Sequence, residues 1–183
     1  EFRPVEAALH HPDARAWDVT REGRHMAVFI ADDFARPGKR SGAWCSTLRP
    51  QSRLDGERRP QVLNVCNFAR PAAHKPALLS PDDARTLFHE FGHALHHILS
   101  DVTYESISGT SVAHDFVELP SQLFEHWLDV PEVLERFATH AETGAPMPAE
   151  TRARLRAAAT FDMGFQTVEY VGSALVDLEL HAG

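Results

Sequence analysis

Three hydrophobic segments in the first third of the chain have the pattern of β-strands. They span residues 24–31, about 42–48 and 61–68, and turn-rich stretches with glycine separate them. From residue 80 onward the hydrophobic spacing changes to that of helices. Strands followed by helices predict an α+β fold that is mainly α, with a small β-sheet near the N-terminal part. We therefore expect a β-rich lead-in over residues 1–75 and a helical part over residues 76–183.

A strongly periodic helix is predicted to begin at residue 80. Ser80 is a favourable N-cap, Pro81 suits the first helical position, and the two acidic residues that follow favour the positive end of the helix dipole. His89 and His93 are one turn apart and project together on one side. The opposite side carries the apolar residues Ala84, Leu87, Phe88, Phe91, Ala94, Leu95, Ile98 and Leu99.

The same helix carries an H-E-x-x-H motif that begins at His89 and ends at His93. Two imidazoles at this spacing can both reach one zinc ion at about 2.0–2.1 Å. Glu90 lies beside them and can reach a metal-bound water without binding the metal itself. Because zinc makes its bound water acidic, the Glu90 carboxylate can accept the proton of that water. The motif predicts a catalytic zinc site, although a chance occurrence on a solvated helix face is the simpler alternative.

Neighbouring residues of the motif have other interpretations. His93 and His97 share the same spacing, but Ala94 follows His93, so that pair lacks an adjacent acid. We interpret His96 and His97 as surface or packing residues. Gly92 costs about 1 kcal/mol against alanine inside a helix, which the close approach of another backbone would explain.

A second helical segment is predicted over residues 112–127, and Pro120 should kink it or mark its first regular turn. The loop 104–111 before it would lie over the metal, where its small residues could admit a substrate backbone. A plain connecting loop fits that composition equally well. Residues 145–159 are predicted to form a surface helix. The apolar stripe of the second segment consists of Phe116, Leu119, Leu123 and Trp127.

A catalytic zinc needs a third protein ligand and one open position. Glu118 follows His93 by 25 residues, which leaves room for a loop and a returning helix. Asp115, one turn earlier, could hydrogen-bond a ligand imidazole. His114 is a rival ligand, and Asp115 and Glu125 could equally belong to a solvated acidic face.

Composition excludes some classes of function. The formal net charge of −8 gives no indication of nucleic-acid or acidic-membrane binding, and no apolar run is long enough to span a bilayer. Cys45 and Cys66 do not form a short metal-type pair, and we expect two free thiols in a reducing cytoplasm. The start at Glu1, without methionine or a signal segment, is expected for a piece of a longer protein.

The H-E-x-x-H helix, the Ser-Gly-Thr loop 108–110 and the segment that contains Glu118 together resemble the thimet oligopeptidase family of zinc peptidases. Within that family they are most similar to the bacterial peptidyl-dipeptidases, with oligopeptidase A-like enzymes next. The resemblance implies a helical, zincin-type core in which His89, His93 and Glu118 hold one zinc ion per chain and Glu90 is the general base. It also implies cleavage of short peptides in a channel between two largely helical halves. The similar segments are residues 36–44, 65–68, 89–96, 108–110, 115–122 and 161–181.

Members of that family extend beyond this chain at both ends. After the region that matches residues 161–181 they carry a Gly/Tyr-rich segment whose tyrosines and histidine assist the transition state, and we expect weak activity without it. We predict a cytoplasmic enzyme, an oligopeptidase or peptidyl-dipeptidase, that acts on short peptides and binds neither nucleic acid nor membranes; its oligomeric state is left open. The alternatives are a non-catalytic zinc- or peptide-binding fragment and a zinc hydrolase of another specificity.

Overall fold

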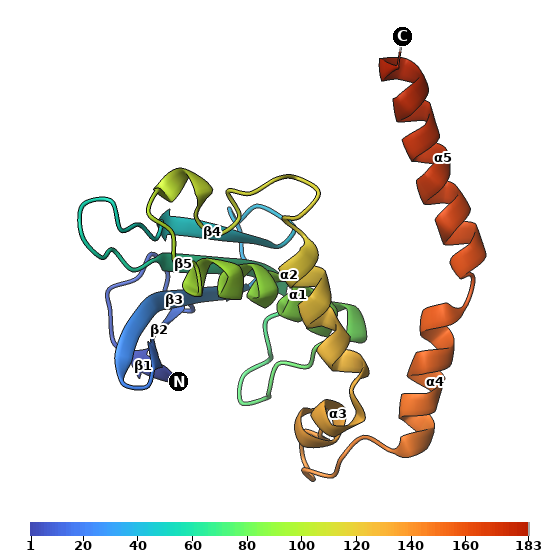
Figure 1. Ribbon diagram of the computed structural model, residues 1–183. Coiled ribbons are helices and arrows are strands. Elements are labelled where there is room, and N and C mark those ends of the chain that lie inside the picture. Colours follow the sequence, from blue (N-terminus) through green and yellow to red (C-terminus); the bar gives the residue numbers. More distant parts are fainter. Residues whose placement is uncertain (183) are drawn as a thin grey trace. The chain divides into compact units, whose positions relative to one another are not determined.

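The computed structural model describes residues 1–182, and they form a mixed α+β structure with one five-stranded sheet (Figure 1). The strands are β1 Phe2–Val5, β2 Arg15–Arg21, β3 Arg24–Phe34, β4 Trp44–Arg49 and β5 Gln61–Phe68. The α-helices are α1 Pro81–Ile98, α2 Leu119–Glu125, α3 Pro131–Phe137, α4 Ala149–Thr160 and α5 Met163–His181. Two 3₁₀-helices are η1 Glu105–Ile107 and η2 His126–Asp129.

The sheet has the strand order β1-β2-β3-β5-β4, so β5 lies between β3 and β4 although it follows both in sequence. β3 and β5 are parallel, and the other neighbouring strands are antiparallel. β4 is therefore an edge strand. It lies next to α1 in the packing of this part of the chain.

The strands predicted at residues 24–31, 42–48 and 61–68 are confirmed as β3, β4 and β5, with small shifts at their ends. β1 and β2 were not predicted from the sequence. β1 contains Pro4, which cannot donate to a ladder and is tolerated because β1 is at the other edge of the sheet. β2 has arginine at both ends and Asp18 in its middle, so its hydrophobic signal is short.

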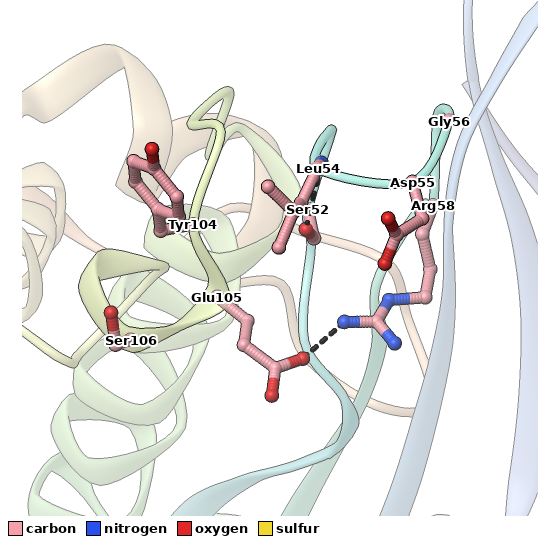
Figure 2. Close-up of a pocket in the computed structure, with 8 residues that line it drawn as sticks. All are labelled: Ser52, Leu54, Asp55, Gly56, Arg58, Tyr104, Glu105 and Ser106. Carbon is pink, nitrogen blue, oxygen red and sulfur yellow. Dashed lines mark hydrogen bonds and ion pairs between the residues drawn. The ribbon is translucent and has the colours of Figure 1, made fainter.

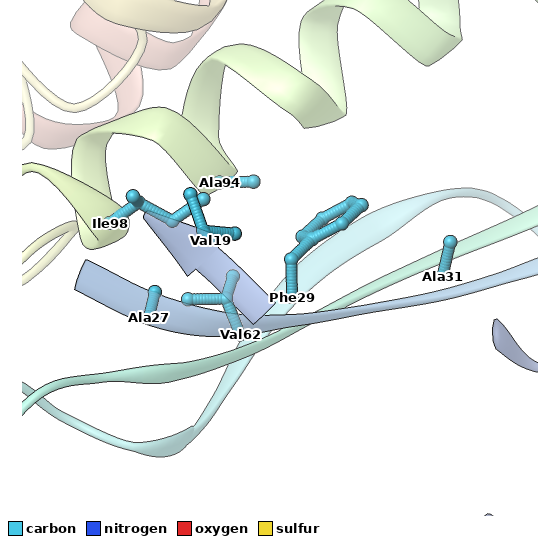
Figure 3. Close-up of a cluster of buried hydrophobic side chains, with 7 residues drawn as sticks. All are labelled: Val19, Ala27, Phe29, Ala31, Val62, Ala94 and Ile98. Carbon is cyan, nitrogen blue, oxygen red and sulfur yellow. The ribbon is translucent and has the colours of Figure 1, made fainter. Parts of the chain in front are cut away.

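One face of the sheet and one side of α1 form the hydrophobic core (Figure 3). Ala94 and Ile98 of α1, at 0% and 1% exposure, pack against side chains of β2, β3 and β5. The strand residues in this cluster are Val19, Ala27, Phe29, Ala31 and Val62. The part of α1 that includes Ala94 and Ile98 is thus buried against the sheet, and the side with His89 is left for the site.

A buried charge cluster fixes the loop that leads into β4. Lys39 is nearly buried and donates to the carbonyl oxygens of Asp32, Phe34 and Cys66 and to the Asp32 carboxylate. Arg36 binds the same carboxylate through two nitrogens, at 2.6 and 2.7 Å, and holds the pKa of Asp32 far below its usual range. Because every one of these charges has partners, their burial is tolerated and the loop has one defined path.

The second helix is shorter than predicted. Residues 112 and 113 are not helical, residues 114–118 form turns, and α2 begins only at Leu119, with Pro120 in its first turn. The expectation of a helix from residue 112 was wrong, whereas the expectation that Pro120 marks the first regular turn is confirmed. Proline lacks an N–H and restricts the residue before it, so a helix readily begins there but does not pass through it.

The chain divides into two compact units, Glu1–Leu128 and Asp129–Gly183. In the second unit, Arg152 of α4 forms an ion pair with Glu135 of α3 at 3.1 Å. The predicted surface helix at residues 145–159 corresponds to α4, which is exposed along most of its length. None of the helices within residues 1–182 combines the length and the hydropathy that a membrane crossing requires.

Candidate metal centre

Helix α1 begins where the sequence predicts. The Ser80 hydroxyl accepts from the Asp83 amide and the Asp83 carboxylate accepts from the Ser80 amide, each at 3.0 Å, which is a capping box. This start fixes which side of the helix carries His89 and His93. Their rings lie edge to face with centroids 4.9 Å apart.

The first turn of α2 lies directly against α1 at Gly92. A Cβ atom on Gly92 would lie 2.6 Å from the Cα atom of Ser121 and 2.7 Å from the carbonyl oxygen of Pro120. Phe124 of α2 stacks on Phe88 of α1, with ring centroids 5.4 Å apart. The glycine therefore permits a backbone contact that brings the start of α2 over the histidine side of α1.

Glu118, immediately before α2, lies beside both histidines as a result. Its Oε2 atom is 3.2 Å from His89 Nε2 and 3.1 Å from His93 Nε2. The Ser121 hydroxyl is buried and donates to Glu118 Oε2 at 2.8 Å, which lowers the pKa of Glu118; the two imidazoles add to that effect. The carboxylate is thus held ionised and pointing at the two ring nitrogens.

These three ligand atoms fit one tetrahedral metal ion. They lie within 4.8 Å of one another, and both histidine–glutamate distances are close to 3.2 Å. Two ligand atoms of a tetrahedral zinc, each at about 2.0–2.1 Å, are roughly 3.3 Å apart. Two imidazoles and a carboxylate are also a donor set that zinc prefers. The rival ligand His114 is exposed and does not belong to this group.

Glu90, between the two histidines in sequence, is only 6% exposed. Burial raises the pKa of Glu90, an effect that His89 partly opposes. A carboxylate with a raised pKa is a better proton acceptor than an exposed one. The same carboxylate interacts electrostatically with His89 and with Glu118.

A carboxylate does hydrogen-bond a histidine of the site, but it comes from the far end of α2. Glu125 Oε1 lies 2.7 Å from His89 Nδ1. Asp115, for which the sequence predicted such a role, is exposed in the turns before α2. The predicted helix from residue 112 would have placed Asp115 and Glu125 on the same face. Because α2 begins only at Leu119, Asp115 lies outside the helix and is not on that face.

His97, one turn after His93, is a buried packing residue, which is one of the two roles predicted for it. It is 5% exposed, with the Thr47 hydroxyl 2.9 Å from Nδ1 and the Thr110 hydroxyl 3.1 Å from Nε2. Burial lowers the pKa of His97 to about 4, so the ring is neutral at pH 7. Gly109, with φ +56°, lies so close that a Cβ atom would be 1.9 Å from His97 Nδ1. The feature of the sequence that could have indicated this burial is the Ser-Gly-Thr segment 108–110, which follows the helix and contacts His97.

A separate cavity of about 460 Å³ lies between the β4–β5 connection and η1 (Figure 2). Arg58 and Glu105 form an ion pair between its two sides. The cavity lining includes no member of the metal-ligand group. The residues that line it are Ser52, Leu54, Asp55, Gly56, Arg58, Tyr104, Glu105 and Ser106.

Comparison with known proteins assigns the family. The model of peptidase family M3 matches residues 1–183, and the chain belongs to this family. It is 45% identical to a dipeptidyl carboxypeptidase of Salmonella typhimurium over 174 residues, which cover 94% of this chain and 25% of that protein. It is 40% identical to oligopeptidase A of Escherichia coli over 176 residues, covering 94% of this chain and 26% of that protein. The resemblance inferred from the motifs is confirmed, and the chain spans about a quarter of the length of these relatives.

Proposed function

We propose that this chain carries the metal centre of a zinc-dependent peptidase that hydrolyses peptide bonds in short peptides. The observation that carries the proposal is the convergence of His89, His93 and Glu118 on one point, beside the buried Glu90, in a chain of peptidase family M3. The helix with its two histidines would then be the centre of a zincin-type core, and the three side chains would hold one zinc ion. When bound, zinc would supply a Lewis acid that polarises the scissile carbonyl and makes a water molecule acidic.

Each residue of the chain then has a defined task. His89 and His93 present their Nε2 lone pairs, and Ser121 orients Glu118 as the third ligand. Glu90 accepts the proton of the attacking water at its carboxylate and delivers it to the leaving amine. The raised pKa of Glu90 suits both steps, because the protonated acid must persist long enough to donate.

The relatives suggest a substrate class and a location for this protein. The relatives include a dipeptidyl carboxypeptidase and an oligopeptidase A, and both names imply peptide substrates. We propose short peptides as substrates here too, cleaved either internally or by release of a dipeptide. The cytoplasmic location stays a prediction, as does the binding of one zinc ion per chain.

Two variants test the function. Glu90→Gln should keep the zinc stoichiometry of the unmodified chain but lose turnover of a quenched fluorescent peptide, because the base but no ligand is removed. His93→Ala should lose most of the zinc. Metal analysis and peptide turnover, measured on the same samples, check both statements.

Each outcome decides something. Equal zinc content in His93→Ala and the unmodified chain would contradict the ligand assignment. Unchanged turnover in Glu90→Gln would contradict the role of Glu90. Zinc binding that depends on His93, without any turnover in the unmodified chain, would favour the non-catalytic zinc- or peptide-binding alternative.

A further inference from the structure

We propose that Glu125 is the positioning residue of the metal centre: it holds the His89 ring in the tautomer and orientation that direct Nε2 toward the metal. This inference rests on the proposed zinc site. It assigns a role to a side chain outside the H-E-x-x-H motif and outside the ligand set.

The two ring nitrogens of His89 face different carboxylates. Nε2 lies 3.2 Å from Glu118 Oε2, and Nδ1 lies 2.7 Å from Glu125 Oε1. A nitrogen that binds a metal cannot carry a proton, so the ring proton must be on Nδ1. A carboxylate accepts at Nδ1, so Glu125 stabilises this tautomer while a metal occupies Nε2; without a metal, the Glu118 carboxylate can accept at Nε2 in the same way.

The Glu125 carboxylate is itself held in place. Arg85, one turn before His89 on α1, lies with Nη1 3.3 Å from the second oxygen, Oε2. The Glu125 side chain is 19% exposed, so solvent screens these interactions less than it would on an open surface. The carboxylate thus bridges two side chains of α1 and has little freedom to turn away.

Helix α2 places Glu118 and Glu125 on the same side. They are seven residues apart, Glu118 at the N-cap of α2 and Glu125 at its last residue, and both approach His89. Helix α2 and its N-cap residue thereby supply one carboxylate at each nitrogen of the same imidazole. Any displacement of α2 along α1 would disturb both contacts together.

His93 has no equivalent support within residues 1–182. Its Nδ1 atom is buried without a hydrogen-bond partner there. The Glu118 carboxylate contacts the His93 ring at Nε2, and the His93 side chain is 11% exposed, whereas the His89 side chain is 27% exposed. His89, the more exposed of the two imidazoles, is thus the one that Glu125 contacts. This is expected, because a less buried ring needs a specific hydrogen bond to fix its orientation.

The test is the zinc dissociation constant of the 183-residue chain, measured by competition with a chromophoric chelator. Glu125→Gln and Glu125→Ala should weaken zinc binding by about 10–100-fold, with the glutamine variant the milder. Asp115→Asn is the matched control, because it removes one carboxylate of the same segment and should change the constant less than twofold. Arg85→Gln should cause a smaller loss than either Glu125 variant.

A second readout separates positioning from general destabilisation. Long-range ¹H–¹⁵N correlation reports the tautomer of each histidine. In the zinc-loaded unmodified chain His89 should carry its proton on Nδ1. In zinc-loaded Glu125→Ala the two tautomers should mix, because the orientation of the ring no longer determines which nitrogen binds zinc, while the circular dichroism of the zinc-free chain stays the same. If the Glu125 variants do not fold, Arg85→Gln still tests the bridge through the same two measurements.

The outcomes distinguish this inference from the function on which it rests. If His93→Ala binds zinc as tightly as the unmodified chain, the proposed metal centre fails. If zinc binding depends on His93 but Glu125→Ala matches the unmodified chain in affinity and tautomer, only the positioning role is overturned. A loss in Asp115→Asn without a loss in the Glu125 variants would likewise overturn it.

Discussion

Gly92 leaves no room for a side chain between the two helices of the site. The atoms that a Cβ would meet at 2.6 and 2.7 Å belong to the backbone of Ser121 and Pro120, so no rotamer change can relieve the contact. The entropic cost of glycine in a helix, about 1 kcal/mol, is offset by the approach of α2. The absence of a Cβ atom at residue 92 therefore allows the start of α2, and with it Glu118, to lie close to α1.

We predict that Gly92→Ala destabilises the first unit and weakens zinc binding together. Overpacking typically costs about 1–3 kcal/mol, which exceeds the gain of about 1 kcal/mol in helix propensity. Urea denaturation gives the stability, and a chelator competition gives the zinc affinity.

The control is Gly172→Ala in α5, where nothing lies within 4 Å of the added Cβ. That variant should be neutral or more stable by up to about 1 kcal/mol and should bind zinc normally. A Gly92→Ala chain with full stability and unchanged zinc affinity would show that α2 can move without consequence for the site.

At the scale of elements, His97 connects three of them. It lies on α1, and its ring nitrogens are next to Thr47 of β4 and Thr110 of the loop before α2. Both hydroxyls can donate or accept, so a neutral imidazole satisfies both. A protonated imidazole would have to donate at both nitrogens from a buried position, which is unfavourable.

This contact predicts acid sensitivity of the zinc-free chain. The pKa of His97 is about 4 in the folded state and about 6.5 when unfolded, so the unfolded state binds its proton more tightly. The stability due to neutral His97 is present above pH 6.5 and is lost as the pH falls toward 4. Between pH 7 and pH 5 the loss from this residue alone should be about 2 kcal/mol.

Urea unfolding at pH 7 and pH 5, in the presence of a chelator, measures that loss. His93 and His96, whose pKa values burial also lowers, change stability in the same direction in every variant. His97→Gln should therefore lose less stability than the unmodified chain over this range. An identical loss in both proteins would mean that His97 does not titrate in the folded state as stated.

At the scale of the whole molecule, the candidate metal site belongs to one unit. His89, His93 and Glu118 all lie in Glu1–Leu128, which also contains the sheet. In the second unit α5 has almost no buried surface, and large apolar side chains such as Phe165, Tyr170 and Leu180 are exposed along it. Zinc should therefore stabilise the two units unequally.

Hydrogen exchange of the full chain, with and without zinc, tests this difference. With free zinc at about 100 times its dissociation constant, the first unit gains about 2.7 kcal/mol. The slowest amides of α1 should then exchange roughly 100-fold more slowly, whereas those of α5 should exchange quickly in both conditions. Zinc-dependent protection in α5 equal to that in α1 would contradict the assignment of the site to one unit.

The sequence by itself determined the local features. Ser80 and Pro81 fixed the start of α1, and the spacing of His89, Glu90 and His93 fixed their common side, because a helix relates neighbouring residues by a constant rotation. The unusual glycine at position 92 also indicated a close backbone contact. The strands β3, β4 and β5 were predictable because their hydrophobic segments are long enough to be recognised.

Only the tertiary structure decided how the parts meet. The choice of Glu125 over Asp115 as the partner of His89 depends on where α2 begins and how it lies against α1. The burial of His97 depends on a strand fifty residues earlier in the chain. Periodicity relates residues within one element, but the path of a connecting loop sets distances between elements. That path results from the packing of the whole unit, so no local pattern contains it.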